Sequence, residues 1–200
     1  MMQLIDPNTT LIGRRAQLLP LEEKYFEELT ALALSPGIFD HMSVNMRSKN
    51  DVRFAFGQAL QEKALGKQFP FVIFDKGIMA GSTRFMNIEL DHRKLEIGAT
   101  WMHPSFWATG LNTECKLLLL TFCFEQFKTI RVEFKTDEKN LRSRRAIEKL
   151  GAKFEGIHRN HIIRHNGTFR NSVFYSIIDS EWESVKKNLT GIVSSWSDTR

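Results

Sequence analysis

Residues 95–151 have the sequence LEIGATWMHPSFWATGLNTECKLLLLTFCFEQFKTIRVEFKTDEKNLRSRRAIEKLG. The pattern of apolar residues and breakers predicts, in order, a strand over 95–102, a helix over about 113–127, a strand over 130–136 and a helix over 140–150. The first of these helices is apolar nearly all round, so we expect it to be packed on most sides. Two strands joined through a helix pair in parallel with a right-handed crossover, which predicts one parallel strand pair in this part of the chain.

The flanking segments predict strands and helices in irregular alternation. On the N-terminal side we expect a strand over 11–18, helices over about 21–34 and 51–66, and two strands over 69–74 and 78–87. On the C-terminal side we expect strands over 152–164 and 168–178, joined by the hairpin signal Asn166-Gly167, and a short helix over 181–189. This order predicts an α/β fold with a mixed sheet, in one domain over residues 1–190 with a flexible tail over 191–200.

Composition limits the class of protein. Apolar residues make up 42% and charged residues 26% of the 200 residues, as in ordinary globular domains. The chain has no run of 18 apolar residues and no basic, then apolar, start, so neither a membrane span nor a secretory signal is expected. Cys115 and Cys123 would lie about 12 Å apart on one helix, too far to bridge. We therefore expect reduced, buried thiols in a cytoplasmic protein, and a net charge of +5 that suits an anionic ligand.

The loop Trp107-Ala108-Thr109-Gly110-Leu111-Asn112-Thr113 precedes the apolar helix. A glycine-bearing loop that opens a helix offers free backbone N–H groups and the positive end of the helix dipole, which together favour a phosphate or diphosphate. A simple turn is the alternative explanation. No Gly-Lys-Ser/Thr follows, and only one glycine is present, so the loop is neither a nucleotide-binding P-loop nor a dinucleotide fingerprint.

The helix over 140–150 carries a second signal. Helical spacing puts Ser143, Ala146, Ile147 and Leu150 on one inner face. The hydroxyl of Ser143 would then point toward the core or a ligand, unless it bonds back to a carbonyl of its own helix. The arginines of this helix form a solvated face or, next to a phosphate loop, contact phosphates.

Three segments together, FWATGLNTECK, DEKNLRSRRAIEKLGAKFEG and NGTFRNSVFYSI, resemble the GNAT superfamily of N-acetyltransferases, and within it the RimJ/RimL-type ribosomal-protein branch. The resemblance is strong over about 69–182. It implies a central, mostly antiparallel sheet with one parallel, splayed strand pair, flanked by helices. Asn112 departs from the Gly or Ala of the family pattern, although asparagine is a good N-cap.

The resemblance implies that acetyl-CoA is the cosubstrate and lies in the splay between strands 95–103 and 130–136, with no metal. Its diphosphate would rest on the amides of about 108–113, and its pantetheine arm would run past Trp101 to His103. Asn140 would bond the arm and Ser143 would lie near the sulfur. The implied cosubstrate-binding residues are Trp101, Met102, His103, Trp107, Ala108, Thr109, Gly110, Leu111, Asn112, Thr113, Asn140, Ser143 and Arg145.

The implied reaction is direct transfer of the acetyl group to a primary amine through a tetrahedral intermediate. The amine must be neutral to attack, which is easier for a protein N-terminal α-amine or a small amine of low pKa than for lysine. A backbone N–H near Trp101 or Met102 would meet the oxyanion, and Ser143 would protonate the departing thiolate.

The general base is not fixed by the resemblance. Ile162 stands where RimL-type enzymes have a glutamate, so Glu96, Glu133 and His161 are the candidates, each with a structural alternative such as pairing with Lys135. Tyr175 is a further candidate proton donor, although a strand tyrosine usually serves packing.

A non-catalytic acyl-CoA-binding or regulatory protein of the same fold is the alternative, kept open by the missing glutamate. No basic stripe supports a nucleic-acid partner, and a homodimer is left open. A metal site is not expected, because His158 and His161 should face opposite sides of a strand and His161 and His165 should lie about 13 Å apart.

Overall fold

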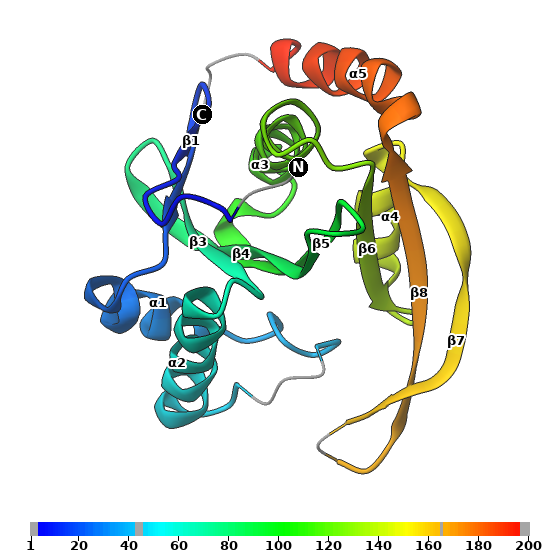
Figure 1. Ribbon diagram of the computed structural model, residues 1–200. Coiled ribbons are helices and arrows are strands. Elements are labelled where there is room, and N and C mark those ends of the chain that lie inside the picture. Colours follow the sequence, from blue (N-terminus) through cyan, green and yellow to red (C-terminus); the bar gives the residue numbers. More distant parts are fainter. Residues whose placement is uncertain (1–3, 43–45, 165, 197–200) are drawn as a thin grey trace.

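The computed structural model describes residues 4–42, 46–164 and 166–196 (Figure 1). The strands are β1 (Leu11–Ile12), β2 (Ala16–Pro20), β3 (Phe69–Asp75), β4 (Ile78–Glu89), β5 (Lys94–Met102), β6 (Arg131–Asp137), β7 (Lys153–Ile163) and β8 (Phe169–Ile178). The helices are α1 (Phe26–Ala33), α2 (Lys49–Ala64), α3 (Leu111–Thr121), α4 (Leu141–Lys149) and α5 (Trp182–Ser194). Short 3-10 turns occupy Glu23–Tyr25, Pro104–Phe106 and Asp179–Glu181, and a π-helical turn, Phe122–Gln126, extends α3.

The strands form one mixed sheet in the order β1-β2-β3-β4-β5-β6-β8-β7. All neighbours are antiparallel except β5 and β6, which confirms the predicted parallel pair. These two strands pair only over three residues each, from Lys94–Glu96 to Arg131–Glu133. Beyond that point they separate, and the gap between their ends is visible in Figure 1.

A β-bulge accompanies the separation of the strands. On β4 the step from Ser82 to Arg84 spans two residues, whereas the facing step on β5 from Gly98 to Trp101 spans three. Ala99, inside this step, has a φ of 46°. An extra residue bends its strand and increases the local twist, so the bulge turns the end of β5 away from β6.

Helices cover both faces of the sheet. Residues of α3, α4 and α5 pack with one face in a core that includes Phe85, Leu119 and Tyr175. Residues of α1 and α2 pack with the other face in a second core around Phe56 and Trp101, and Figure 1 shows α1 and α2 on the side away from α3 and α5. Each large side chain buried in this way contributes about 1.5–3 kcal/mol.

Two expected elements differ from the structure. Residues 11–18 are not one strand: β1 and β2 pair antiparallel with each other, because the chain turns at Gly13. A tertiary contact explains the turn. The buried carboxylate of Glu114 on α3 accepts hydrogen bonds from the backbone N–H groups of Arg14 and Arg15 and so holds the turn against α3. At the other end α5 continues through Ser194, into the stretch 191–200 expected to be flexible, of which residues 197–200 lie outside the described residues.

Cys115 and Cys123 are both free and buried, as predicted. Burial raises the pKa of the Cys115 thiol to about 12. Within the described part of the chain, none of the helices is both long and apolar enough to cross a membrane.

Candidate active site

A cavity of about 990 Å³ lies where β5 and β6 separate. It is lined by the end of β5, the loop that follows, the first turns of α3, the end of β6, α4 and the segment after α5. Of the residues singled out in the sequence, the cavity brings together Glu96, Trp101, Met102, Trp107, Ala108, Thr109, Gly110, Asn112, Thr113, Asn140 and Ser143. Residues from four separate elements of the chain therefore share one site.

The loop before α3 has the geometry of an anion site. Gly110 is the N-cap of α3 with a φ of 89°, and Ala108 also has a positive φ, of 59°. Within the ranges that the structure describes, the backbone N–H groups of Ala108, Thr109 and Gly110 have no hydrogen-bond partner. Free amides at the positive end of a helix dipole bind anions.

Two residues of this loop differ from their expected roles. The side chain of Leu111 is buried in the core, and its backbone N–H, expected to hold the diphosphate, donates to the Thr109 hydroxyl at 3.4 Å. Asn112 is the second residue of α3, not its cap, because the helix begins at Leu111 rather than near Thr113. The side-chain oxygen of Asn112 is buried without a partner among the described residues.

Cationic side chains line the same cavity as the loop. Arg14, Arg15, Lys76, Arg142 and Lys149 all line the cavity. The guanidinium of Arg142 lies 3.7 Å from the centroid of the Trp107 ring, a cation–π contact that holds it at the entrance. Arg145, which the sequence favoured, is exposed and does not line the cavity.

The segment after α5 also reaches this loop. A Cβ atom built on Gly110 would lie 2.7 Å from the indole of Trp196, so the indole rests against the glycine. Nη1 of Arg14 donates to the carbonyl of Trp196 at 3.1 Å. Sequence reasoning missed Trp196, because no local pattern connects a tail residue to a loop so distant in the chain.

The inner face of α4 is as predicted: Ser143, Ala146, Ile147 and Leu150 all line the cavity. Asn140 is the N-cap of α4, and its side-chain oxygen accepts the N–H of Ser143 at 3.0 Å. The Ser143 hydroxyl has no hydrogen-bond partner within the part of the chain that the structure describes, so it does not bond back to its own helix. It is available to a ligand in the cavity.

The end of β5 presents backbone groups to the cavity. The N–H of His103 donates to the carbonyl of Ala80 on β4 at 2.8 Å. Because successive N–H groups of a strand point in opposite directions, the N–H of Met102 points away from β4, into the splay. The imidazole of His103 instead bonds the Ser105 hydroxyl at 2.8 Å and does not line the cavity.

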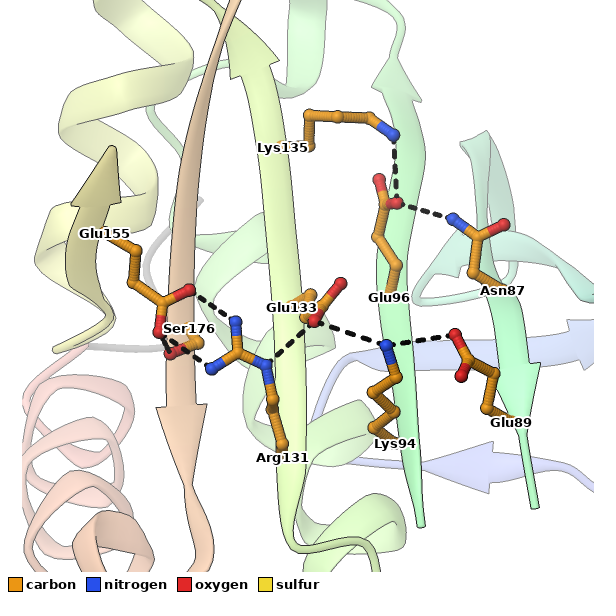
Figure 2. A network of polar contacts seen from close by, with 9 residues as sticks. All are labelled: Asn87, Glu89, Lys94, Glu96, Arg131, Glu133, Lys135, Glu155 and Ser176. Carbon is orange, nitrogen blue, oxygen red and sulfur yellow. Dashed lines mark hydrogen bonds and ion pairs between the residues drawn. The ribbon is translucent and has the colours of Figure 1, made fainter. Parts of the chain in front are cut away.

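The two candidate glutamates have different surroundings, drawn in Figure 2. Glu96 lines the cavity, is 4% exposed and accepts from Asn87 at 2.9 Å and from Lys135 at 3.2 Å. Glu133 faces it across the parallel pair but does not line the cavity, because Arg131 at 2.8 Å and Lys94 at 4.0 Å hold it in a surface ion-pair network. Of these two glutamates, Glu96 is therefore the one whose side chain lines the cavity.

His161 lies next to the cavity rather than in it. Its Nδ1 atom is 3.0 Å from the Ser172 hydroxyl, and burial, with the nearby charge of Lys135, lowers its pKa. The expectation that His158 and His161 face opposite sides was wrong, since their ring centroids are 5.5 Å apart. Two extra residues on β7 between His158 and Ile162, with Asn160 at a φ of 51°, break the alternation.

Ile162, which stands where the resemblance implies a glutamate, lines the cavity. The Tyr175 hydroxyl donates to Glu148 at 2.8 Å and is packed under α4, outside the cavity lining. His165 lies outside the described residues.

Two buried cations line the cavity and were not singled out from the sequence. Lys116 on α3 is 5% exposed, donates to the Thr100 hydroxyl at 2.6 Å, and burial lowers its pKa to about 8. Arg170 on β8 is 7% exposed. Strand and helix periodicity alone did not distinguish them from ordinary surface cations.

The sequence and the structure were compared with known proteins. Residues 15–153 match the family model described as Acetyltransferase (GNAT) domain. The chain is 32% identical over 110 residues to YdaF of Bacillus subtilis (strain 168), provisionally named a ribosomal N-acetyltransferase; the match covers 55% of this chain and 59% of YdaF. The chain spans 59% to 66% of the length of the curated relatives it matches.

Solved structures have the same fold. A crystal structure from T. thermophilus, provisionally described as an acetyltransferase, is 30% identical with a TM-score of 0.85, covering 96% of this chain and 100% of that one. RimL, a ribosomal L7/L12 alpha-N-protein acetyltransferase solved with coenzyme A, is 20% identical with a TM-score of 0.76, covering 86% of this chain and 99% of that one. The fold and the family match confirm the resemblance seen in the sequence, and the chain belongs to the GNAT family of acetyltransferases.

Proposed function

We propose that this protein transfers the acetyl group of acetyl-CoA directly to a primary amine, either the α-amine of a protein N-terminus or a small amine. The observation that carries the proposal is one cavity that holds three free loop amides, the Ser143 hydroxyl and the Glu96 carboxylate. These groups supply anion binding, an acid and a base, which are the parts that acyl transfer to an amine requires.

The residues present fit acetyl-CoA, which supplies an activated acyl group. The amides of Ala108, Thr109 and Gly110 would hold its diphosphate, with Arg14 and Arg142 adding positive charge at the rim. The backbone of β5 near Met102 and the free side-chain amide of Asn140 would hold its pantetheine arm. Each of these groups lines the same cavity.

Three groups of this chain would carry the chemistry. Glu96 accepts the proton of the attacking amine, directly or through one water. The N–H of Met102, which points into the splay, stabilises the negative charge that develops on the acyl oxygen. Ser143 donates a proton to the departing sulfur. An α-amine, with an ordinary pKa of about 7.7–8.0, needs less help from Glu96 than a lysine does.

The names of the relatives support a protein acceptor. YdaF is provisionally named a ribosomal N-acetyltransferase, and RimL is described as acting on the α-amine of ribosomal L7/L12. These descriptions favour an N-terminal α-amine over a lysine side chain.

Two measurements test the proposal. Acetyl-CoA should raise the melting temperature, and release of free CoA should accelerate when amines are added. Stabilisation by acetyl-CoA without turnover on a broad amine panel would favour the non-catalytic acyl-CoA-binding alternative. The absence of any stabilisation would contradict both functions.

A further inference from the structure

Arg170 is a buried cation without a partner among the described residues. It projects from β8, lines the cavity and is 7% exposed. Its Nε atom is buried with no hydrogen-bond partner, and within residues 4–42, 46–164 and 166–196 no hydrogen bond or ion pair is formed by the guanidinium. A buried polar group normally finds a partner, and a charged group left without one is costly.

The charges around Arg170 are already matched with one another. Lys135 pairs with Glu96, and Arg164 pairs with the buried Asp137. Burial lowers the pKa of Arg170, and the charges of Asp137 and Glu96 oppose this only in part. Three cations and two carboxylates therefore leave one positive charge uncompensated at this wall of the cavity.

Arg170 lies on the same face of the sheet as Glu96. Register pairing connects Glu96 with Glu133 on β6 and Glu133 with Ser176 on β8, and Arg170, six residues before Ser176, points to the same face because side chains alternate along a strand. Its register partner on β7 is Ile162. The phosphate loop belongs instead to α3, which packs on the opposite face. Arg170 therefore faces the position of the amine acceptor rather than the diphosphate.

We propose that Arg170 binds a carboxylate of the acceptor, so that the substrates are amines with an acidic group near the reacting nitrogen. The inference rests on the proposed function, since it takes the amine to lie at Glu96. The planar guanidinium matches a carboxylate with two parallel hydrogen bonds. A single negative charge fits better than a phosphate dianion, because Glu96 and Asp137 are close by.

The carboxylate can come from a free amino acid or from an acidic side chain of a peptide, and paired acceptors distinguish the two. Alanine against alaninamide tests an α-carboxylate, and Ala-Asp-Ala-amide against Ala-Asn-Ala-amide tests a side-chain carboxylate. Turnover with acetyl-CoA and calorimetric binding in the presence of CoA are both measured. The variants are Arg170→Met, Arg170→Lys and the control Arg159→Gln, which removes an exposed cation of β7 outside the main cavity.

The wild type should prefer the carboxylate member of at least one pair by about 10- to 100-fold, the value of a charge-assisted, bidentate contact. Arg170→Met should abolish that preference, Arg170→Lys should restore part of it, and Arg159→Gln should keep it. The melting temperature of Arg170→Met should equal or exceed that of the wild type, because an uncompensated buried charge is removed.

Two results would overturn the inference: equal use of acid and amide acceptors by the wild type, or a large loss of stability in Arg170→Met with an unchanged preference. If acetyl-CoA binds but no amine is acetylated, the proposed function fails. The calorimetric preference for the carboxylate acceptors then still decides whether Arg170 binds a carboxylate.

Discussion

Nζ of Lys135 on β6 lies 3.2 Å from Oε2 of Glu96 on β5, so one ion pair joins the last paired residue of β5 to a residue of β6 two positions beyond the pairing. Both side chains line the cavity, and the ion pair holds the Glu96 carboxylate there. Gly98 leaves room for it, because a Cβ there would lie 3.0 Å from Oε1 of Glu96. The separation of the strands and the position of the proposed base are thus one structural feature.

Glu96→Gln should lower kcat/KM for the amine by about 10²- to 10⁴-fold, the usual contribution of a general base, while acetyl-CoA affinity changes little. Steady-state kinetics with calorimetric titration of acetyl-CoA measures both. Glu133→Gln is the matched control, because Glu133 lies in the outer ion-pair network. Equal losses of kcat/KM in the two variants would show that activity depends on the ion-pair network rather than on proton transfer to Glu96.

Ser143→Ala should lower kcat by about 10²-fold with little change in the KM of the amine, since the proposed role of the hydroxyl is to protonate the departing sulfur. Ser143→Thr keeps a hydroxyl and should recover part of the rate. A single-turnover comparison of the three proteins measures the chemical step. Full activity in Ser143→Ala would remove the serine from the mechanism.

Gly81→Ala should destabilise the protein by about 1–3 kcal/mol, as overpacking does. A Cβ at Gly81 would lie 2.1 Å from the carbonyl oxygen of Trp101, so β5 must shift at the residues that line the cavity. Gly57→Ala in the middle of α2, where a Cβ meets nothing within 4 Å, should instead stabilise by about 0.5–1 kcal/mol. Urea unfolding measures both, and similar behaviour of the two variants would contradict the close approach.

Lys116→Met should raise stability at pH 7 by on the order of 3 kcal/mol, because the folded state holds Lys116 at a pKa of about 8. Below pH 8 both states of the wild type bind the proton and the folded state is penalised. As pH rises from about 8 to the ordinary lysine value, the folded state loses the proton first, and wild-type stability recovers relative to the variant.

The pH dependence is read as the difference between wild type and Lys116→Met, since burial of Cys115 acts in the opposite direction in both proteins. Urea unfolding at pH 7 and at pH values between 8 and 10 gives that difference. A difference in unfolding free energy between the two proteins that stays constant over this pH range would show that Lys116 titrates normally.

Local periodicity was enough to predict much of the fold. The parallel strand pair and the inner face of α4 with Ser143 follow from residue spacing within single elements, and the structure has both. The hairpin β1–β2 and the shared side of His158 and His161 could not be predicted, because a buried carboxylate and a two-residue bulge override the local pattern.

The site could be predicted only where it is local. The loop at Gly110 and the α4 helix each lie in one continuous segment. The choice between Glu96 and Glu133, which are register partners, depends on where the strands part. The role of Arg170 depends on which cations are already paired, and that is decided by contacts among three strands.

The most direct test of the account is an amide chemical-shift titration of isotope-labelled protein with CoA and, separately, with pantetheine, which lacks the diphosphate. The amide signals of Ala108, Thr109 and Gly110 should move strongly with CoA and little with pantetheine, because their free N–H groups receive the diphosphate. If CoA binds and these three signals stay in place while others move, the loop is not the diphosphate site. The observation that carries the proposed acetyl transfer would then be contradicted.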